Sequence, residues 1–362
     1  MKQEIIDKIN RLASQDEPFL FVINYQGDKA FIRQLSDINP EECLFDFEGR
    51  GNSSDEMKNN SGKIAEISWQ IAPPLYEDYE RSFDIVKNNI MAGNSYLTNL
   101  TCKVPVSCNL SLEDIFNQAK GKYKLLLRRS ESINPFVCFS PETFVRIKGG
   151  RIYSYPMKGT LDASLPDAEK QLMEDRKEAA EHATIVDLIR NDLSRVAENV
   201  RVDKYRYIDV LHTNKGDILQ TSSEISGRLP EDYPHHLGEI LDAQLPAGSI
   251  TGAPKDKTMQ IIQEAEGYDR GFYTGIMGIY DQGELNSAVM IRFVEEEASS
   301  VDFEADGEKN FKTGGGKEPK ASRKLYFKAG GGITSKSDCR KEYEEVIQKI
   351  YLPIQENPSS EY

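Results

Sequence analysis

The chain has 362 residues, of which 38% are hydrophobic and 29% charged, and its formal net charge is −14. This composition is typical of a globular protein with a large core, and length alone favours about two domains. The acidic surface repels nucleic acids and anionic membranes, so both are excluded as partners. An anionic metabolite can still bind where the site supplies a local cation or a metal ion.

The cysteines are five in number and none forms a CxxC pair. An odd count without metal-ligand spacing predicts a reduced, intracellular protein with neither a disulfide framework nor a zinc site. The first ten residues are charged and lack an apolar leader segment, and no stretch approaches the ~20 apolar residues of a membrane span. We therefore expect a cytoplasmic location.

The first half of the chain begins with a predicted amphipathic helix over residues 1–15. Two apolar runs, Phe19–Asn24 and Ala30–Arg33, flank Gly27 and Asp28 and predict a β-hairpin. Residues 52–62 are polar and rich in Gly, Ser and Asn, which is typical of a loop. Tyr79–Met91 has the spacing of a helix with one apolar side.

The middle of the chain mixes strands and helices. Apolar runs over Phe136–Lys148 and Arg151–Tyr155 surround two glycines and predict a second hairpin. A long helix is expected from about Asp167 to Arg190, because apolar residues recur there with helical period. Leu219–Leu229 alternates between apolar and polar residues, as a strand does.

The last part begins with a predicted helix over Pro254–Glu266, where proline stands near the first turn. Tyr273–Tyr280 and Leu285–Val294 predict a third hairpin. Leu325–Lys328 is expected to be a strand that ends at a run of glycines, and a final helix is expected from about Ser337 to Ile350. Hairpins outnumber strand–helix–strand units, which favours an α+β fold with large antiparallel sheets.

One segment, residues 295–324, stands apart from this pattern. It begins acidic, turns basic and contains three consecutive glycines. This composition is typical of a mobile surface insertion between two strands. A lid over the active site is the alternative.

Four glutamates form two pairs with a spacing of three residues: Glu178 with Glu181, and Glu342 with Glu345. On a helix such side chains share one face, and most are simply solvated. Glu181 and Glu345, however, adjoin apolar runs at the edge of the core, where a carboxylate needs a counter-charge. Two facing glutamates would suit Mg²⁺, which takes oxygen ligands and retains waters and substrate oxygens. Both interpretations remain open at this point.

Lys158 precedes Gly159 at the end of a predicted strand. It is either a surface lysine or a nucleophile, and a nucleophile needs its pKa lowered by ~3 units from ~10.4 through burial or a nearby cation such as Mg²⁺. Gly330–Gly332 forms either a plain loop or a cluster of backbone N–H groups that binds an anion. Arg292 stands inside an apolar run, where an arginine usually has a carboxylate partner from the protein or a ligand.

These residues belong to eight short motifs that resemble, in the same order, those of the chorismate-utilising enzymes. The family includes anthranilate synthase large subunits, aminodeoxychorismate synthase component I, and isochorismate and salicylate synthases. The resemblance covers roughly residues 75–352, and the first ~70 residues match loosely. The motifs are Ser140–Phe144, Lys158–Thr160, Glu181–Asp192, Gly248–Lys255, Tyr273–Gly275, Ile291–Arg292, Ala329–Ile333 and Glu342–Glu345.

The resemblance implies a single α+β domain in which two large antiparallel sheets form a sandwich with outer helices. Residues 1–74 would supply N-terminal strands and a helix to the sandwich, and residues 75–362 would form the chorismate-binding region. Mg²⁺ would be bound at the ring carboxylate of chorismate. Glu181 and Glu345 match the metal ligands of the family, and Glu178 and Glu342 match the flanking carboxylates.

The resemblance also implies contacts with the substrate. Glu142 matches the carboxylate that acts near the ring hydroxyl. Arg292, Tyr273 and the backbone of Gly330, Gly331 and Gly332 match the side that holds the pyruvyl carboxylate. The remaining positions matched to substrate contacts are Gly159, Thr160, Thr251, Gly252 and Lys336.

The residue at position 158 separates the reactions within the family, because aminodeoxychorismate synthases have lysine there and anthranilate synthases usually have alanine. The resemblance implies that Lys158 attacks ring carbon 2, that the hydroxyl at carbon 4 leaves with a proton from Glu142, and that ammonia then attacks carbon 4. Glu142 needs a raised pKa for this role. We therefore expect formation of 4-amino-4-deoxychorismate, in the p-aminobenzoate branch of folate biosynthesis.

Two alternatives remain. An anthranilate synthase large subunit would aminate carbon 2 and release pyruvate, and Lys158 speaks against it. A catalytically silent subunit that only holds a glutaminase is contradicted by intact Lys158, Glu142, Glu181 and Glu345. No Gly-x-Cys-x-Gly segment occurs, so we expect ammonia to come from a separate glutamine amidotransferase subunit.

Two positions depart from the family pattern. Leu97 stands where isochorismate and salicylate synthases have lysine and the aminating enzymes often have glutamine. Leucine cannot activate water, which argues against isochorismate formation. Gln220 stands where many relatives have histidine, and we expect no acid–base role for it because an amide does not titrate.

Overall fold

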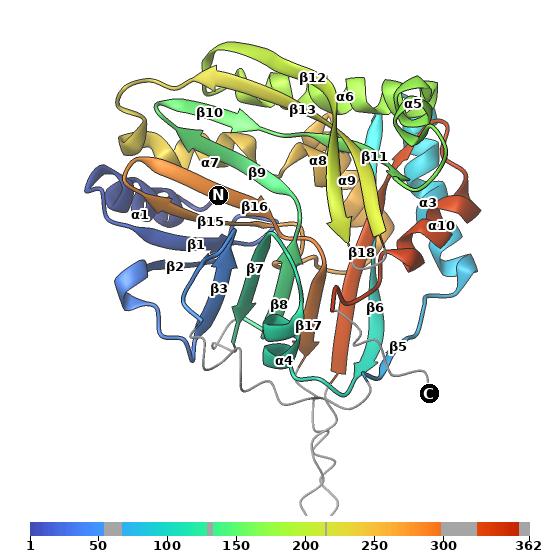
Figure 1. Cartoon of the computed structure of the whole chain (residues 1–362), viewed down its shortest axis with the longest axis horizontal. Helices are drawn as coiled ribbons and strands as arrows, with labels where there is room; N and C mark the ends of the chain where they lie inside the picture. Colours follow the sequence, from blue (N-terminus) through green and yellow to red (C-terminus); the bar gives the residue numbers. More distant parts are fainter. Residues whose placement is uncertain (54–66, 129–132, 214–215, 298–323, 355–362) are drawn as a thin grey trace, which may run out of the picture.

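The computed structural model describes residues 1–53, 67–128, 133–213, 216–297 and 324–354. Within these residues the strands form two large antiparallel sheets of nine strands each, with helices outside them (Figure 1). This is the architecture that the sequence predicts. No helix in the described part of the chain is long and apolar enough to cross a membrane.

The first sheet contains all three predicted hairpins, which pair residues 19–23 with 30–34, 143–148 with 151–154, and 276–281 with 284–289. The strand β12 (Glu198–Thr213) lies beside β13 and extends the sheet at that end. The other strands follow in the spatial order β11 (Met157–Asp162), β13 (Gly216–Arg228), β10 (Arg151–Ser154), β9 (Thr143–Lys148), β16 (Glu284–Val289), β15 (Ile276–Asp281), β1 (Phe19–Ile23) and β2 (Ala30–Gln34).

The second sheet is built around two long neighbouring strands, β6 (Leu97–Cys108) and β18 (Lys324–Thr334). The short strand β5 (Trp69–Ile71) pairs with β6 beside this path. The other strands follow in the order β14 (Gly252–Ala253), β6 (Leu97–Cys108), β18 (Lys324–Thr334), β17 (Phe293–Glu297), β8 (Phe136–Ser140), β7 (Tyr123–Leu127), β3 (Cys43–Phe47) and β4 (Arg50–Gly51).

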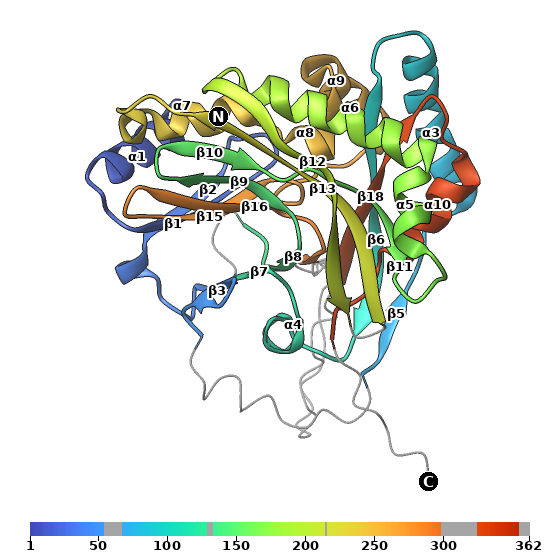
Figure 2. The same ribbon diagram turned by 45° about the horizontal axis from the view of Figure 1, so that its top comes forward.

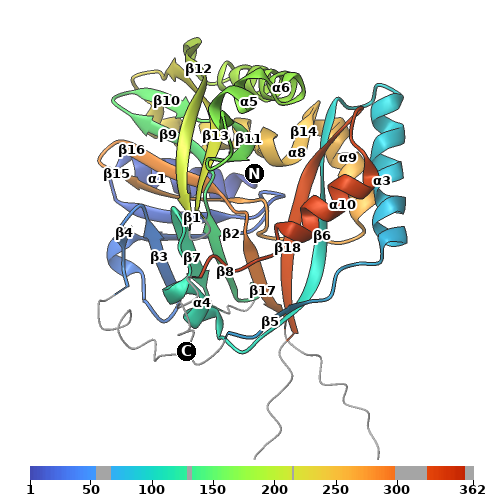
Figure 3. The ribbon, with the colours of Figure 1, turned by 45° about the vertical axis from the view of Figure 1, so that its right-hand side comes forward.

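Helices cover the outer faces of both sheets (Figures 1 and 3). The outer layer of the first sheet includes α1 (Gln3–Ser14), α6 (Arg176–Leu193) and α7 (Leu237–Gln244), and α6 runs along β12 and β13 (Figure 2). The outer layer of the second sheet includes α3 (Tyr76–Met91), α4 (Leu112–Gln118), α9 (Lys255–Glu266) and α10 (Cys339–Gln348). The remaining helices are α5 (Ala168–Glu174), α8 (Gly248–Thr251) and the 3₁₀ turns η1 (Leu35–Asp37) and η2 (Tyr233–His236).

Buried side chains form a layer on each side of the sheets. One cluster joins the first sheet to α1, α6 and α7, and a second joins the second sheet to α3, α4, α9 and α10. A third cluster joins the inner faces of the two sheets and includes Phe136, Met277 and Phe293. Phe136 and Phe293 stack with ring centroids 4.5 Å apart. The alternation of inward and outward residues along the strands thus produces the sandwich.

The chain crosses from one sheet to the other at two adjacent places. Each crossing lies inside a segment that the sequence predicts as one uninterrupted strand. Phe136–Lys148 divides into β8 and β9 at Pro141 and Glu142, and Leu285–Val294 divides into β16 and β17 at Met290–Arg292. The backbone N–H of Val289 donates to the carbonyl of Glu142 at 3.2 Å. Arg292 therefore lies between strands, with φ of +57°, and the prediction that it lies inside a strand is wrong.

Three other predictions need correction. The long helix is broken into α5 and α6 at Asp175, because this side chain caps α6 by accepting from the backbone N–H groups of Lys177 and Glu178. The glycines Gly330–Gly332 lie within β18 and are not a loop after it. Residues 295–297 belong to β17. Residues 298–323 of the predicted insertion lie outside the described residues.

Candidate active site

A cavity of about 460 Å³ is lined by residues of both sheets and of the helices α6 and α8. Its size lies in the range of small-molecule sites. Both crossings between the sheets reach its wall, and they bring Glu142 and Arg292 into it. The predicted site residues that line the cavity are Glu142, Lys158, Glu181, Tyr273, Arg292, Gly330, Gly331, Gly332 and Lys336.

The other predicted residues lie close to this wall but outside the lining. Gly159 and Thr160 follow Lys158 on β11, and Thr251 and Gly252 stand at the junction of α8 and β14. A Cβ atom at Gly159 would lie 2.9 Å from Oε2 of Glu178, which places that carboxylate against β11. The second glutamate pair, Glu342 and Glu345, lies on α10.

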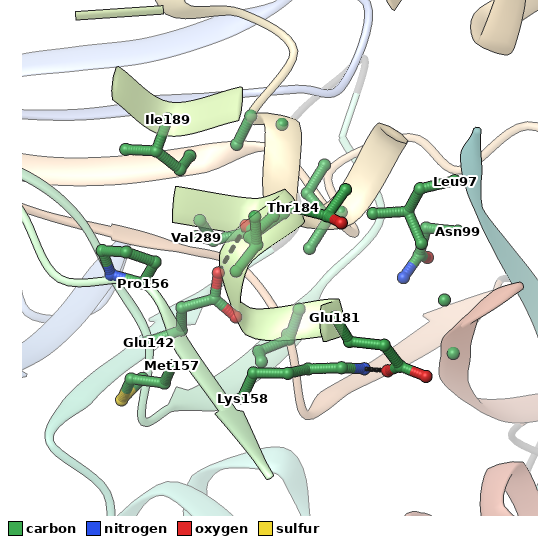
Figure 4. A pocket seen from close by; sticks show the side chains of 18 of the residues that line it. Leu97, Asn99, Glu142, Pro156, Met157, Lys158, Glu181, Thr184, Ile189 and Val289 are labelled. Carbon is green, nitrogen blue, oxygen red and sulfur yellow. Dashed lines mark hydrogen bonds and ion pairs between the residues drawn. The ribbon is translucent and has the colours of Figure 1, made fainter. Parts of the chain in front are cut away.

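Lys158 and Glu181 form an ion pair inside the cavity, with 3.0 Å between Nζ and Oε2 (Figure 4). Nζ of Lys177 lies 3.7 Å from the other carboxylate oxygen. Burial would lower the pKa of Lys158, but the charge and hydrogen bond of Glu181 outweigh burial and raise it. The lowered pKa that a nucleophile needs is therefore not supplied by the chain alone. Lys158 must lose this partner before Nζ can give up its proton.

Glu142, unlike Lys158, lies in the cavity wall without an ion-pair partner at contact distance among the described residues. Its carboxyl group accepts a hydrogen bond of 2.5 Å from the hydroxyl of Ser249. Burial raises the pKa of Glu142, and the Ser249 hydrogen bond and the charges of Arg292 and Lys349 offset part of that increase. The raised pKa is the direction that a general acid requires.

The four helical glutamates form two pairs, and the negative charges repel each other within each pair. Burial and the charge of Glu181 raise the pKa of Glu178, and burial with the charge of Glu345 helps to keep the pKa of Glu342 raised. Burial opposes ionisation of Glu345 too, but Lys349, at 2.8 Å, outweighs it and lowers the pKa. Carboxylate oxygens are the ligands that Mg²⁺ takes, and its charge would relieve this repulsion.

The carboxylate ligands therefore fit Mg²⁺, although lysines supply the counter-charge to Glu181 and Glu345 in this structure. In the described part of the chain, no three acidic, histidine or cysteine side chains are gathered closely enough to form a metal site. Glu181 is engaged by Lys158 and Lys177, and Glu345 is engaged by Lys349. Glu178, Glu181, Glu342 and Glu345 are thus candidates to hold the ion once these ion pairs open.

Two of the three glycines of β18, Gly330 and Gly332, are closely packed, and the segment is a strand and not a loop. Their register with β6 is regular, Gly330 opposite Thr101 and Gly332 opposite Asn99. A Cβ atom at Gly330 would lie 2.5 Å from the carbonyl oxygen of Leu100, and one at Gly332 would lie 3.1 Å from a methyl group of Leu97. The loop conformation that both interpretations assumed is wrong, because the segment is an extended strand, and contact of its backbone with an anion stays a prediction.

Three lining residues were missed by the sequence analysis. Lys177 and Lys349 stand four residues from Glu181 and Glu345 respectively, a spacing at which helical side chains pair, so the sequence held a signal for both. Ser249 lies within the motif Gly248–Lys255 but has no spacing relation to Glu142. The two departures, Leu97 and Gln220, also line the cavity.

The family model described as chorismate binding enzyme matches residues 20–308. The chain therefore belongs to the chorismate-binding enzyme family. An uncharacterized PabA-like protein of Haemophilus influenzae is 46% identical over 353 residues, which are 98% of this chain and 97% of that protein.

Relatives with named activities match over shorter stretches. Aminodeoxychorismate synthase component 1 of Bacillus subtilis is 28% identical over 299 residues, 79% of this chain and 57% of that protein. Anthranilate synthase component 1 of Aquifex aeolicus is 34% identical over 218 residues, 58% of this chain and 38% of that protein.

The fold is also that of a solved structure from Bacillus anthracis, named a putative 2,3-dihydroxybenzoate-specific isochorismate synthase. It matches with a TM-score of 0.67 and 18% identity, over 96% of this chain and 86% of that one. The predicted α+β sandwich is therefore confirmed. An identity this low supports the shared fold alone.

Proposed function

We propose that the chain aminates chorismate at carbon 4 and forms 4-amino-4-deoxychorismate, in the p-aminobenzoate branch of folate biosynthesis. The observation that carries this proposal is a lysine, Lys158, in the wall of the same cavity as the buried acid Glu142. The similarity to aminodeoxychorismate synthase component 1 of Bacillus subtilis supports it.

The proposed chemistry uses these two side chains in sequence. Nζ of Lys158, once neutral, forms a bond to ring carbon 2, both ring double bonds shift, and the hydroxyl at carbon 4 leaves as water with the proton of Glu142. Ammonia then bonds to carbon 4, Lys158 departs from carbon 2, and Glu142 takes back a proton from the new amine. Chorismate and ammonia thus become 4-amino-4-deoxychorismate and water.

The charges of the cavity suit a substrate with two carboxylates. Five cationic side chains line it against three acidic ones, Glu142, Glu181 and Asp192, whereas the whole chain carries a net charge of −14. Such a local reversal of sign concentrates an anionic ligand. The five are Lys158, Lys177, Arg292, Lys336 and Lys349.

The proposal includes Mg²⁺, with Glu178, Glu181, Glu342 and Glu345 as the residues that would hold it. Bound there, the ion would supply positive charge for the ring carboxylate of chorismate. With Glu181 engaged by the ion, Lys158 would lose the carboxylate that stabilises its charged form, and its pKa would fall.

The nitrogen source is ammonia, free or delivered by a separate glutamine amidotransferase subunit. The chain has no Gly-x-Cys-x-Gly segment of the kind that carries a glutaminase nucleophile. The complex needs to form only during turnover. The isolated chain should therefore use ammonium salts and should not use glutamine.

A second candidate is the anthranilate synthase reaction, because the Aquifex aeolicus relative carries that name. Amination at carbon 2 would need that carbon to be open to ammonia, and in our proposal Lys158 takes that position. Intact Lys158, Glu142 and Glu181 also argue against a silent subunit that only binds a glutaminase.

The test is identification of the product by mass spectrometry. The purified chain is incubated with chorismate, Mg²⁺ and ¹⁵N-ammonium, and parallel samples contain glutamine in place of ammonium or a chelator in place of Mg²⁺. We expect labelled 4-amino-4-deoxychorismate in the first sample alone. Labelled anthranilate with pyruvate would establish the second candidate, and intact chorismate would establish the silent subunit.

A further inference from the structure

Two sets of contacts position Glu142. One set fixes its main chain at the crossing between the sheets, and the other holds its carboxyl group. Its backbone N–H donates to the hydroxyl of Ser140 at 3.1 Å, and its carbonyl accepts from Val289. These contacts fix the main chain of Glu142. They leave the carboxyl group free to rotate, and the restraint on that group comes from Ser249.

Ser249 is brought to Glu142 by the short helix α8, and α8 is tightly held. A Cβ atom at Gly248 would lie 2.9 Å from a methyl group of Leu188 on α6, so α8 packs directly on the helix that carries Glu181. Just after α8, Lys255 forms a buried ion pair of 2.9 Å with Asp192 at the end of α6. The Ser249 hydroxyl therefore cannot drift away from Glu142 without a shift of α8.

We infer that Ser249 is the positioning residue of Glu142: its hydroxyl holds Oε1 and leaves Oε2 as the atom that exchanges a proton with the substrate. This inference rests on the proposed function, in which Glu142 protonates the departing hydroxyl. In Figure 4 one carboxyl oxygen of Glu142 carries the hydrogen bond, and the other lies on the side of Lys158 and Glu181.

The proton cycle explains why a hydroxyl is suited to this place. When Glu142 is neutral, its proton sits on Oε2 and Oε1 accepts from Ser249. When the proton has moved to the leaving oxygen, Ser249 donates to a full negative charge, and hydrogen bonds to charged groups are the stronger ones. Ser249 thus stabilises the product form of the acid, and its loss should raise the pKa of Glu142 further.

Two other charges also lower the pKa of Glu142, but neither favours one carboxyl oxygen over the other. Arg292, between β16 and β17, and Lys349, after α10, both favour the ionised carboxyl group. Within the described residues, neither forms a hydrogen bond with the Glu142 carboxyl group. Only the Ser249 bond specifies which oxygen keeps the proton.

The experiment compares Ser249→Ala, Ser249→Thr and a structural control, Ser287→Ala. Ser287 is fully buried, and its hydroxyl contacts the backbone of Val145. For Ser249→Ala we expect kcat for amination to fall about tenfold or more, with KM within about twofold. The alkaline limb of the kcat profile should move up by about one pH unit, because the acid stays protonated longer. Ser249→Thr should restore both values.

A titration that is independent of turnover accompanies the kinetics. The infrared band of the protonated Glu142 carboxyl group is isolated by difference against Glu142→Gln in the same background. In Ser249→Ala this band should persist to higher pH than in the wild type, and in Ser287→Ala it should not move. If Ser249→Ala shifts neither the band nor the pH profile, Ser249 has only a structural role and the inference is wrong. If the wild type makes no 4-amino-4-deoxychorismate, the proposed function fails, and the infrared titration still decides whether Ser249 controls Glu142.

Discussion

The buried ion pair between Asp192 and Lys255 gives a prediction whose size follows from the structure. The side chains are 4% and 7% exposed, and the amine also donates to the carbonyl of Gln244 at 2.8 Å. Replacement of Lys255 by Met keeps the length of the side chain but leaves the Asp192 carboxylate buried without its partner. Breaking a buried pair in this way costs about 3–5 kcal/mol of unfolding free energy.

The loss should depend on pH with a definite sign. Burial already raises the pKa of Asp192, although Lys255 and its hydrogen bond offset part of the effect. In Lys255→Met that pKa rises further, so the folded state binds a proton more tightly than the unfolded state does. The destabilisation is then largest above the folded pKa and declines as pH falls towards the unfolded pKa near ~3.9, by up to about 1.4 kcal/mol for each unit.

The assay is urea unfolding of the wild type, Lys255→Met and the control Lys257→Met at pH 8 and pH 5.5. Lys257 is an exposed residue on the same helix. We expect a loss of about 3–5 kcal/mol for Lys255→Met at pH 8, a clearly smaller loss at pH 5.5, and less than about 0.5 kcal/mol for the control. An equal loss at both pH values, or one under 1 kcal/mol, would refute the reasoning about a buried unpaired carboxylate.

The remaining predictions concern the chemistry. Lys158→Ala should abolish 4-amino-4-deoxychorismate formation while chorismate still binds, as measured by product analysis and calorimetry, and Lys158→Arg should not rescue it because a guanidinium stays protonated. The Lys158–Glu181 pair is half-buried in the wall of the cavity and contributes on the order of 1 kcal/mol, so the variant should remain folded by circular dichroism. Glu142→Gln should lower kcat about 10²–10⁴-fold and remove the alkaline limb of the profile, since the amide has no proton to give; a wild-type rate would exclude the acid role. Chelation should stop turnover and Mg²⁺ should restore it, and Glu181→Gln and Glu345→Gln should each weaken Mg²⁺ binding in calorimetry; full activity in excess chelator would contradict the metal assignment.

Periodicity was sufficient to predict the sheets and most helices, because a strand that faces a core on one side alternates and an outer helix carries one apolar stripe. Periodicity did not predict the strand boundary where one apolar run contains strands of two different sheets. Residues 136–148 read as one strand, since both β8 and β9 are apolar, although Pro141 in the run was a signal for a break beside Glu142. The break at Asp175 was available in the sequence, because an aspartate before a helical run is a capping signal.

The site was predictable to the extent that its residues lie in recognisable motifs. The two lysines Lys177 and Lys349 could have been found from their helical spacing to Glu181 and Glu345. The Ser249–Glu142 contact could not, because it joins residues 107 positions apart on different elements. The charge state of Lys158 was also beyond the sequence, since it depends on which carboxylate the fold places beside it.

The central claim is that Lys158 acts as a covalent catalyst, and intact-mass spectrometry tests it most directly. The wild type and Lys158→Ala are each mixed with chorismate and Mg²⁺ in the absence of ammonia and quenched, and their intact masses are compared. The account predicts an adduct with the mass of chorismate minus water, located on Lys158 by peptide mapping and absent from the variant. If the wild type shows no adduct and Lys158→Ala makes 4-amino-4-deoxychorismate at the wild-type rate, the lysine is not the nucleophile.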